Sequence, residues 1–265
     1  IHSIEADRPI GISFLHNTAG NIYIDAGNAD IVVAGKLTNL TGTTTLITSG
    51  TISTTATMGG ESLVSVGGKT VNLTAGTGIG TTLSPLQVDL ADSIPNTILN
   101  ASSGGNIYIR EIDGVLNVGT ITAVRNSWVG ESRGLVSLSA AGDILGTATS
   151  LVSGGAIVLE STGGAVGSST SLLRIDTGNR ASHILTGAAV DGIYAEEISG
   201  NLQVFELKSP GQTVSLRVDD GSLMDGNNNA VVDTRAVEAL LASVWTDLQL
   251  TEDTGAGSKV QEAKD

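Results

Sequence analysis

Four oxygen-bearing side chains near the C-terminal end have the spacing of a calcium-binding loop. Positions 1, 3, 5 and 9 of this segment are held by Asp225, Asn227, Asn229 and Asp233. Carboxylate and amide oxygens at these positions suit a hard cation such as calcium. The segment departs from an EF-hand loop at position 6, which is Ala230, and at position 12, which is Ala236. The alternative interpretation is an Asx-rich turn that leads into a helix cap.

Acidic residues also occur in close pairs, as Glu111-x-Asp113 and Glu196-Glu197. Paired carboxylates can act as general acid and base. Neighbours on a strand point to opposite faces, so the side chains of Glu196 and Glu197 do not converge. We interpret both pairs as solvated loops between strands, and we predict no catalytic or cofactor-binding residues.

The histidines, His2, His16 and His183, are scattered and form no metal-binding spacing. We predict that each is a surface or turn residue.

Composition excludes several classes of protein. The chain has 265 residues, of which 13 are basic and 27 acidic, giving a net charge of −14 and arguing against nucleic acid or anionic membrane as partner. It has no cysteine, which excludes a disulfide scaffold and a cysteine-ligated metal centre. No apolar run approaches the ~18 residues of a transmembrane helix. With 35 glycines and only 3% aromatic residues, the composition favours thin, repetitive aliphatic layers.

Internal repetition is present at a spacing of about 86 residues. The segment that begins at Ile107 (IYIREIDGVLNV) is repeated from Ile193 (IYAEEISGNLQV), an offset of 86. Upstream, LQVD at Leu86 matches LRID at Leu173, an offset of 87. The peptide GNIYI occurs at residues 20–24 and again at 105–109, an offset of 85. The chain therefore contains between two and three copies of one unit.

A shorter pattern within each unit predicts strands. Apolar and small polar residues alternate in segments such as 71–75 (VNLTA) and 157–161 (IVLES), and glycines follow at the corners. Such short strands must stack on similar neighbours to bury their apolar faces. We predict an all-β parallel β-solenoid (β-helix) with about four coils per unit, inward aliphatic columns and outward polar ladders. An antiparallel β-sandwich is the alternative.

The pattern changes near the end of the chain, and we predict two regions. Residues 1–224 form the β-solenoid, with a partial copy before about residue 70 and two fuller copies after it. Residues 225–265 contain the Asx-rich turn and a short amphipathic α-helix, capped by Asp233 or Thr234. The apolar residues at helical spacing are Val237, Leu240, Leu241, Val244, Trp245 and Leu248. This segment would cap the last coil or dock another chain. Because the sequence starts at Ile1, we expect a processed product or a piece of a longer protein.

The repeated peptides resemble filamentous-haemagglutinin-type repeats of large secreted or surface bacterial exoproteins. The resemblance covers roughly residues 13 to 224. It lies in GNIYI, in G-x-I-G-T/S followed by L-x-V/I-D, and in V-x-L-x-A-x-G-x-I. It implies a right-handed coil and an extracellular adhesin, fibre or biofilm matrix component.

We therefore predict a secreted or cell-surface structural module that is not an enzyme. It has no cofactor unless the Asp225 segment binds calcium. Its expected partners are further copies or neighbouring modules of the same protein, and a cell-surface glycan or receptor. The alternatives are a polysaccharide-acting β-helix enzyme and a glycan-binding adhesin tip. The aromatic candidates for a sugar platform are Trp128, Tyr23, Tyr108 and Tyr194. The tyrosines could share one face, although we expect them to pack locally.

Overall fold

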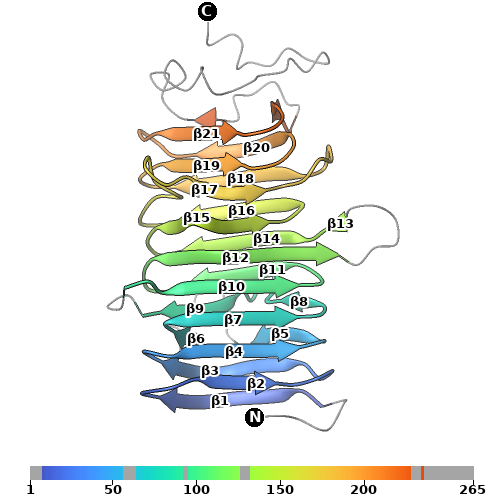
Figure 1. The fold of residues 1–265 in the computed structure, drawn as a ribbon, viewed down its shortest axis with the longest axis vertical. Helices are drawn as coiled ribbons and strands as arrows, with labels where there is room; N and C mark the ends of the chain where they lie inside the picture. Colours follow the sequence, from blue (N-terminus) through green and yellow to red (C-terminus); the bar gives the residue numbers. More distant parts are fainter. Residues whose placement is uncertain (1–7, 56–63, 92–94, 126–131, 228–233, 236–265) are drawn as a thin grey trace, which may run out of the picture.

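The computed structural model describes residues 8–55, 64–91, 95–125, 132–227 and 234–235. Within these residues the fold is all-β and contains no helix. The strands form two sheets, and within each sheet the strands are stacked along the long axis of the molecule (Figure 1). The pairings between neighbouring strands are parallel, except that β12 and β13 are antiparallel. The predicted all-β parallel architecture is confirmed at this level.

Sheet A has ten strands. They are β2 (Ile22–Asp25), β4 (Thr43–Thr48), β7 (Thr70–Ala75), β10 (Ile98–Ser103), β12 (Leu116–Arg125), β13 (Ser132–Arg133), β15 (Ile144–Ser153), β17 (Leu173–Asp176), β19 (Ile193–Glu197) and β21 (Val214–Val218).

Sheet B has thirteen strands. They are β1 (Ile10–Asn17), β3 (Ile31–Asn39), β5 (Thr51–Thr54), β6 (Ser65–Gly68), β8 (Gly78–Ile79), β9 (Leu86–Leu90), β11 (Ile107–Glu111), β14 (Leu135–Ala140), β16 (Ala156–Ser161), β18 (Ile184–Ala189), β20 (Leu202–Lys208), β22 (Leu223–Asp225) and β23 (Thr234–Arg235).

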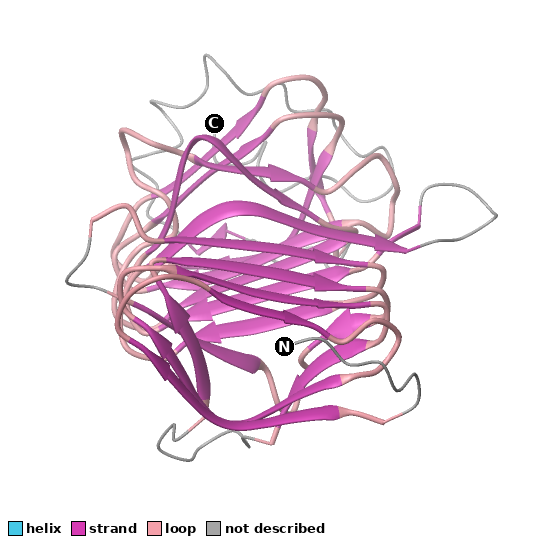
Figure 2. Ribbon diagram, turned by 60° about the horizontal axis from the view of Figure 1, so that its bottom comes forward, coloured by secondary structure: helices cyan, strands magenta, loops and turns pink. Residues whose placement is uncertain are grey.

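The chain alternates between the two sheets. From β14 to β22, even-numbered strands pair in sheet B and odd-numbered strands pair in sheet A. Figure 2 shows the two layers of strands from a second direction. One strand of sheet A followed by one layer of sheet B is called a coil here. The layers β5 with β6, and β8 with β9, each consist of two short strands, because both members pair along β3 or β11.

The core lies between the sheets and consists of aliphatic columns. Ile107, Val136, Ile157 and Leu185 are successive register partners in sheet B, and each is fully buried. Burial of one such side chain is worth about 1.5–3 kcal/mol. Alternate residues point outward and form the predicted polar ladders, as where Asn100 Nδ2 donates to Asn72 Oδ1 at 2.9 Å. In strands such as β4 and β7, binary alternation therefore separates the core residues from the outer ones.

The repeat does not contain a whole number of coils. The matching strands β2, β11 and β19 lie in sheets A, B and A. From β11 to β19 the chain takes seven steps between sheets, through β12, β14, β15, β16, β17 and β18, which makes three and a half coils. The prediction of about four coils is therefore wrong. The number of residues per coil varies because the loops differ in length. The register partners Val136 and Ile157 are 21 residues apart, whereas Ile107 and Val136 are 29 apart.

The predicted C-terminal helix lies outside the described residues from position 236 onwards. Its predicted cap region is described in part. Thr234 and Arg235 form β23, which pairs with Leu207 and Lys208 of β20. The backbone of Thr234 extends sheet B, and its role as a helix cap stays a prediction, because the helix lies outside the described residues.

Candidate functional site

Two repeat-equivalent glutamates are buried inside the stack. Glu111 ends β11 and Glu197 ends β19, and neither side chain is exposed to solvent. The interpretation as solvated loops is therefore wrong for Glu111 and for the Glu196-Glu197 pair, which lie on strands, whereas Asp113 is exposed in the loop between β11 and β12. Each glutamate is the third inward position of its strand, because it continues the alternation begun by Ile107 or Ile193. The predicted divergence of Glu196 and Glu197 is confirmed, since Glu196 lies on the outer side and contacts two arginines.

Both buried glutamates contact the same place in the adjacent coil. Glu197 accepts hydrogen bonds from the Thr177 backbone N–H at 3.0 and 3.1 Å and from Thr177 Oγ1 at 2.9 Å. Glu111 Oε2 accepts from the Leu90 backbone N–H at 3.1 Å. Leu90 and Thr177 are equivalent in the repeat, each two residues beyond the register partner of its glutamate. We call Glu111 and Glu197 the coil-locking glutamates, because each joins two layers of one sheet.

The environment of Glu197 favours its protonated form. Burial raises the pKa of the Glu197 carboxyl to about 8, and the nearby carboxylate of Asp176 acts in the same direction. The hydrogen bonds from Thr177 oppose this shift but do not cancel it. Near neutral pH the Glu197 site therefore holds a proton.

A charged cluster adjoins this site at the edge of sheet A. Arg133 Nη1 lies 2.6 Å from Asp176 Oδ1 and donates to Ser153 Oγ at 3.1 Å. The same nitrogen donates to the Asp176 carbonyl at 2.9 Å. Arg133 reaches this point because β13 folds back along β12 as the antiparallel strand. The arginine thus ties a side strand to a coil 43 residues further along the chain.

His183 lies beside this cluster and is only 6% exposed. A Cβ atom on Gly178 would stand 3.1 Å from Arg133 Nε and 3.2 Å from His183 Nδ1, so the two side chains meet over this glycine. Gly178 has φ +75°, which also favours glycine. His183 is not at the surface, but the predicted turn position is confirmed, because its backbone N–H donates to the Arg180 carbonyl at 2.9 Å and closes a turn. The predicted surface position is confirmed for His16, which is exposed on β1, and His2 lies outside the described residues.

A second charged group lies on the outer face of sheet A. Arg174, Glu196 and Arg217 are successive register partners. Glu196 is 3.6 Å from Arg174 Nε and 3.2 Å from Arg217 Nη1, and Arg217 also pairs with Asp219 at 2.9 Å. Because these pairs are partly exposed, each contributes little to stability. Their alternating sign fixes the register of three successive coils.

The predicted calcium ligands are only partly within the described chain. Asp225 ends β22, and its Oδ1 accepts from the Asn227 backbone N–H at 2.9 Å. Asn227 Nδ2 donates to the Phe205 carbonyl at 2.6 Å. These contacts form an Asx turn, the alternative interpretation of the segment. Asn229 and Asp233 lie outside the described residues, so the calcium site stays a prediction. Among the described residues, no group of three or more His, Cys, Asp or Glu is placed to hold a metal.

The aromatic candidates do not form one platform. Tyr23 and Tyr194 belong to sheet A, whereas Tyr108 belongs to sheet B. The half-coil step separates them, so the expectation that they could share one face is wrong. Tyr23 is 55% exposed. Trp128 lies outside the described residues.

Comparison with known proteins found no protein-family model, no curated protein and no solved structure that matches this chain. The resemblance to filamentous-haemagglutinin-type repeats therefore stays a prediction from the sequence. Within the described residues there is no helix of the length and apolarity needed to cross a membrane.

The buried site limits the chemistry available to these residues. The Glu197 carboxyl has no exposed surface, so it can exchange a proton but cannot touch a solute that stays in solvent. Its contacts join adjacent coils. The arrangement is therefore suited to holding the stack together and to coupling the stability of the stack to pH.

Proposed function

We propose that the chain is a β-solenoid module that serves as a structural part of an extracellular bacterial fibre, adhesin or matrix protein. The observation that carries the proposal is the repeat of three and a half coils, which places β2, β11 and β19 alternately in the two sheets without breaking either one. A unit that adds layers with every copy lengthens a molecule in one direction only. Length and stiffness are properties that a spacer or fibre needs.

The contacts between coils support a mechanical role. The nine strands along sheet A from β2 to β21, stacked about 4.8 Å apart, make a rod of about 40 Å. The aliphatic columns and the coil-locking glutamates join successive layers along the same direction. Force along the rod would have to break backbone ladders in both sheets. This arrangement supports slow unfolding of the module.

Assembly would use the ends of the stack. Among the described strands, β2 and β21 stand at the two ends of the sheet A path, and each pairs with one described neighbour. A strand edge of this kind is a template for a further parallel strand. We therefore propose further copies, or neighbouring modules of the same protein, as partners.

Sedimentation velocity of the full chain over a wide concentration range tests this assembly. The expected result is a series of species with frictional ratios that rise with mass, as for rods joined end to end. A single compact monomer at every concentration would overturn the assembly proposal. Immunogold labelling of intact producing cells tests the extracellular location, and label confined to permeabilised cells would refute it.

A polysaccharide-acting β-helix enzyme is the second candidate, and one observation favours it. Arg133, Asp176 and His183 come together from three separate segments, although the sequence scatters them. Incubation with polygalacturonate or alginate, followed by a reducing-end assay, tests for cleavage. Turnover by the native chain that disappears in Arg133→Gln would support the enzyme and would contradict a purely structural role. No new reducing ends with either polymer would reject cleavage of these polymers.

A further inference from the structure

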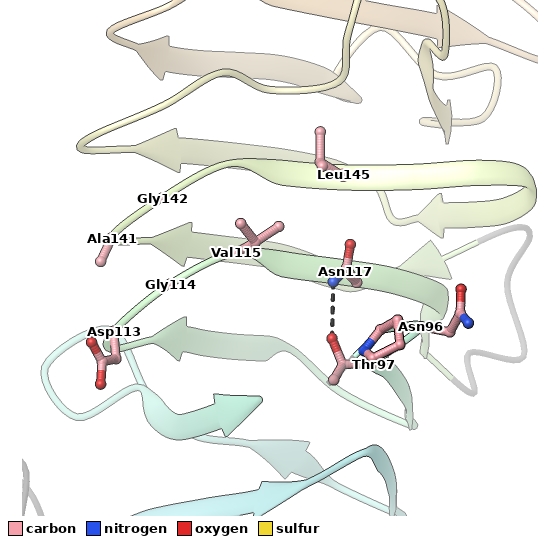
Figure 3. A pocket seen from close by; sticks show the side chains of 10 residues that line it. Asn96, Thr97, Asp113, Gly114, Val115, Asn117, Ala141, Gly142 and Leu145 are labelled. Atoms are coloured by element: carbon pink, nitrogen blue, oxygen red, sulfur yellow. Dashed lines mark hydrogen bonds between the residues drawn. The ribbon is translucent and has the colours of Figure 1, made fainter. Parts of the chain in front are cut away.

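A shallow groove crosses one corner of the stack, outside the repeat contacts described above. Its volume is about 580 Å³, which is within the range of small-ligand sites. Its walls come from residues 95–97, from residues 113–115 between β11 and β12, and from residues 141–142 between β14 and β15. Asn117 and Leu145, which are register partners on β12 and β15, complete it (Figure 3).

The polar groups of the groove are held in place. Asn117 Nδ2 donates to Thr97 Oγ1 at 2.9 Å, and Thr97 is only 5% exposed. This contact fixes the Asn117 amide while its oxygen can still accept a hydrogen bond. Asn96 has φ 60°, the only positive φ of a non-glycine residue in the described chain. Asp113 is exposed, and Figure 3 shows it at the opposite end of the groove from Asn96.

Apolar groups lie between these polar ones. Val115 and Leu145 are both half-buried on the wall, and Pro95 adds an apolar ring at the rim. Figure 3 shows Val115 beside Asn117 on one layer and Leu145 on the layer above them. The groove therefore combines hydrogen-bonding groups with a small apolar surface, and it is not a deep apolar cavity.

The charge of the groove selects among ligand classes. Asp113 is the one charged residue among the lining residues, and the chain as a whole carries −14. Anionic ligands are therefore repelled. A lipid chain would need a deeper apolar channel than Val115 and Leu145 provide. Neutral sugars remain well matched, because they combine many hydroxyls with apolar ring faces.

We infer that this groove binds a neutral oligosaccharide, with hydroxyl groups on Asn117 and Asp113 and a ring face over Val115 and Leu145. The feature is specific to this copy of the repeat. The equivalent positions in the following copy are Ser199 for Asp113, Asn201 for Val115 and Gln203 for Asn117. Gln203 instead donates through Nε2 to the Arg180 carbonyl at 2.8 Å. The inference does not rest on end-to-end assembly.

Saturation-transfer NMR on the full chain tests the inference. The probes are cellotriose, maltotriose, mannotriose and triacetylchitotriose, with a sulfated heparin disaccharide as the anionic comparison. We expect saturation transfer to at least one neutral trisaccharide and none to the heparin disaccharide. Absence of transfer to all four neutral probes, or transfer to the heparin disaccharide alone, would overturn it.

Matched variants locate the binding. Asp113→Ala and Asn117→Ala should each weaken the trisaccharide about tenfold, the loss expected for one hydrogen bond. Gln203→Ala, at the equivalent place in the next copy, should leave the affinity unchanged. Because Asp113 is exposed, its variant should keep the native thermal midpoint even if Asn117→Ala does not fold. Equal affinity in the native chain and in Asp113→Ala, or equal loss in Gln203→Ala, would place the sugar elsewhere and refute the inference.

Discussion

Replacing Glu197 with glutamine should stabilise the protein at neutral pH and remove one defined part of its pH dependence. The folded chain holds this carboxyl at a pKa of about 8, against an ordinary value of 4.5. Between these two pH values the folded chain binds more protons at this site than the unfolded chain. The contribution of Glu197 to the free energy of unfolding is therefore largest below about pH 4.5, and it decreases progressively as the pH rises to about 8.

The size of the effect follows from the shift. One pKa unit corresponds to about 1.4 kcal/mol of unfolding free energy. The native chain therefore loses about 4–5 kcal/mol of stability between the two pKa values, of which about 3 kcal/mol is already lost at pH 7. Glutamine has no such proton to lose. Its amide oxygen can still accept from the Thr177 N–H, which keeps the link between coils.

Urea unfolding followed by circular dichroism at pH 5, 6, 7, 8 and 9 measures this difference. The stability of Glu197→Gln relative to the native chain should rise by about 1.4 kcal/mol per pH unit up to about pH 8 and then level off. Glu160→Gln, which changes an exposed glutamate on β16, provides the baseline. A difference between Glu197→Gln and native protein that stays constant with pH, or that falls as pH rises, would refute the reasoning.

Four further changes probe the fold and its ligands. Glu111→Ala should cost about 1–3 kcal/mol in urea unfolding, because it removes the acceptor of a buried backbone N–H. Ile157→Ala should cost about 2–5 kcal/mol in the same assay, because it opens a cavity in a fully buried column. Gly178→Ala should lower the thermal midpoint, whereas Gly11→Ala should not, because only the first has a positive φ and close neighbours. If the Asp225 segment binds calcium, added calcium should raise the midpoint of the native chain but not that of Asp225→Asn. No shift in either would reject the site.

Local alternation was enough to predict the strands. Residues 71–75 (VNLTA) alternate between apolar and polar side chains, and β7 covers Thr70–Ala75 with the matching burial pattern. The parallel stacking was predicted because matching peptides recur at one fixed interval, which favours stacked equivalent strands over the antiparallel β-sandwich that was the alternative. The number of coils did not follow, because glycine-rich loops vary in length. Only the pairing of β11 with β14 in sheet B, and of β19 with β17 and β21 in sheet A, shows the half-coil step.

The buried site was predictable only in part. The alternation that places Ile193 and Ala195 inward also points to Glu197, so its burial could have been read from the strand itself. The general tendency of glutamate to be exposed argued the other way. The ion pair between Arg133 and Asp176 could not be predicted from the sequence, because it depends on β13 running back antiparallel to β12. The groove likewise needs three corners that only the stack brings together.

Cryo-electron microscopy of the native material tests the central proposal most directly. A structural β-solenoid module predicts rods with an axial layer spacing of about 4.8 Å, joined into filaments whose repeat is near the ~40 Å length of the described stack. Separate particles that never join, at any protein concentration and with or without calcium, would contradict the proposed structural role of this chain.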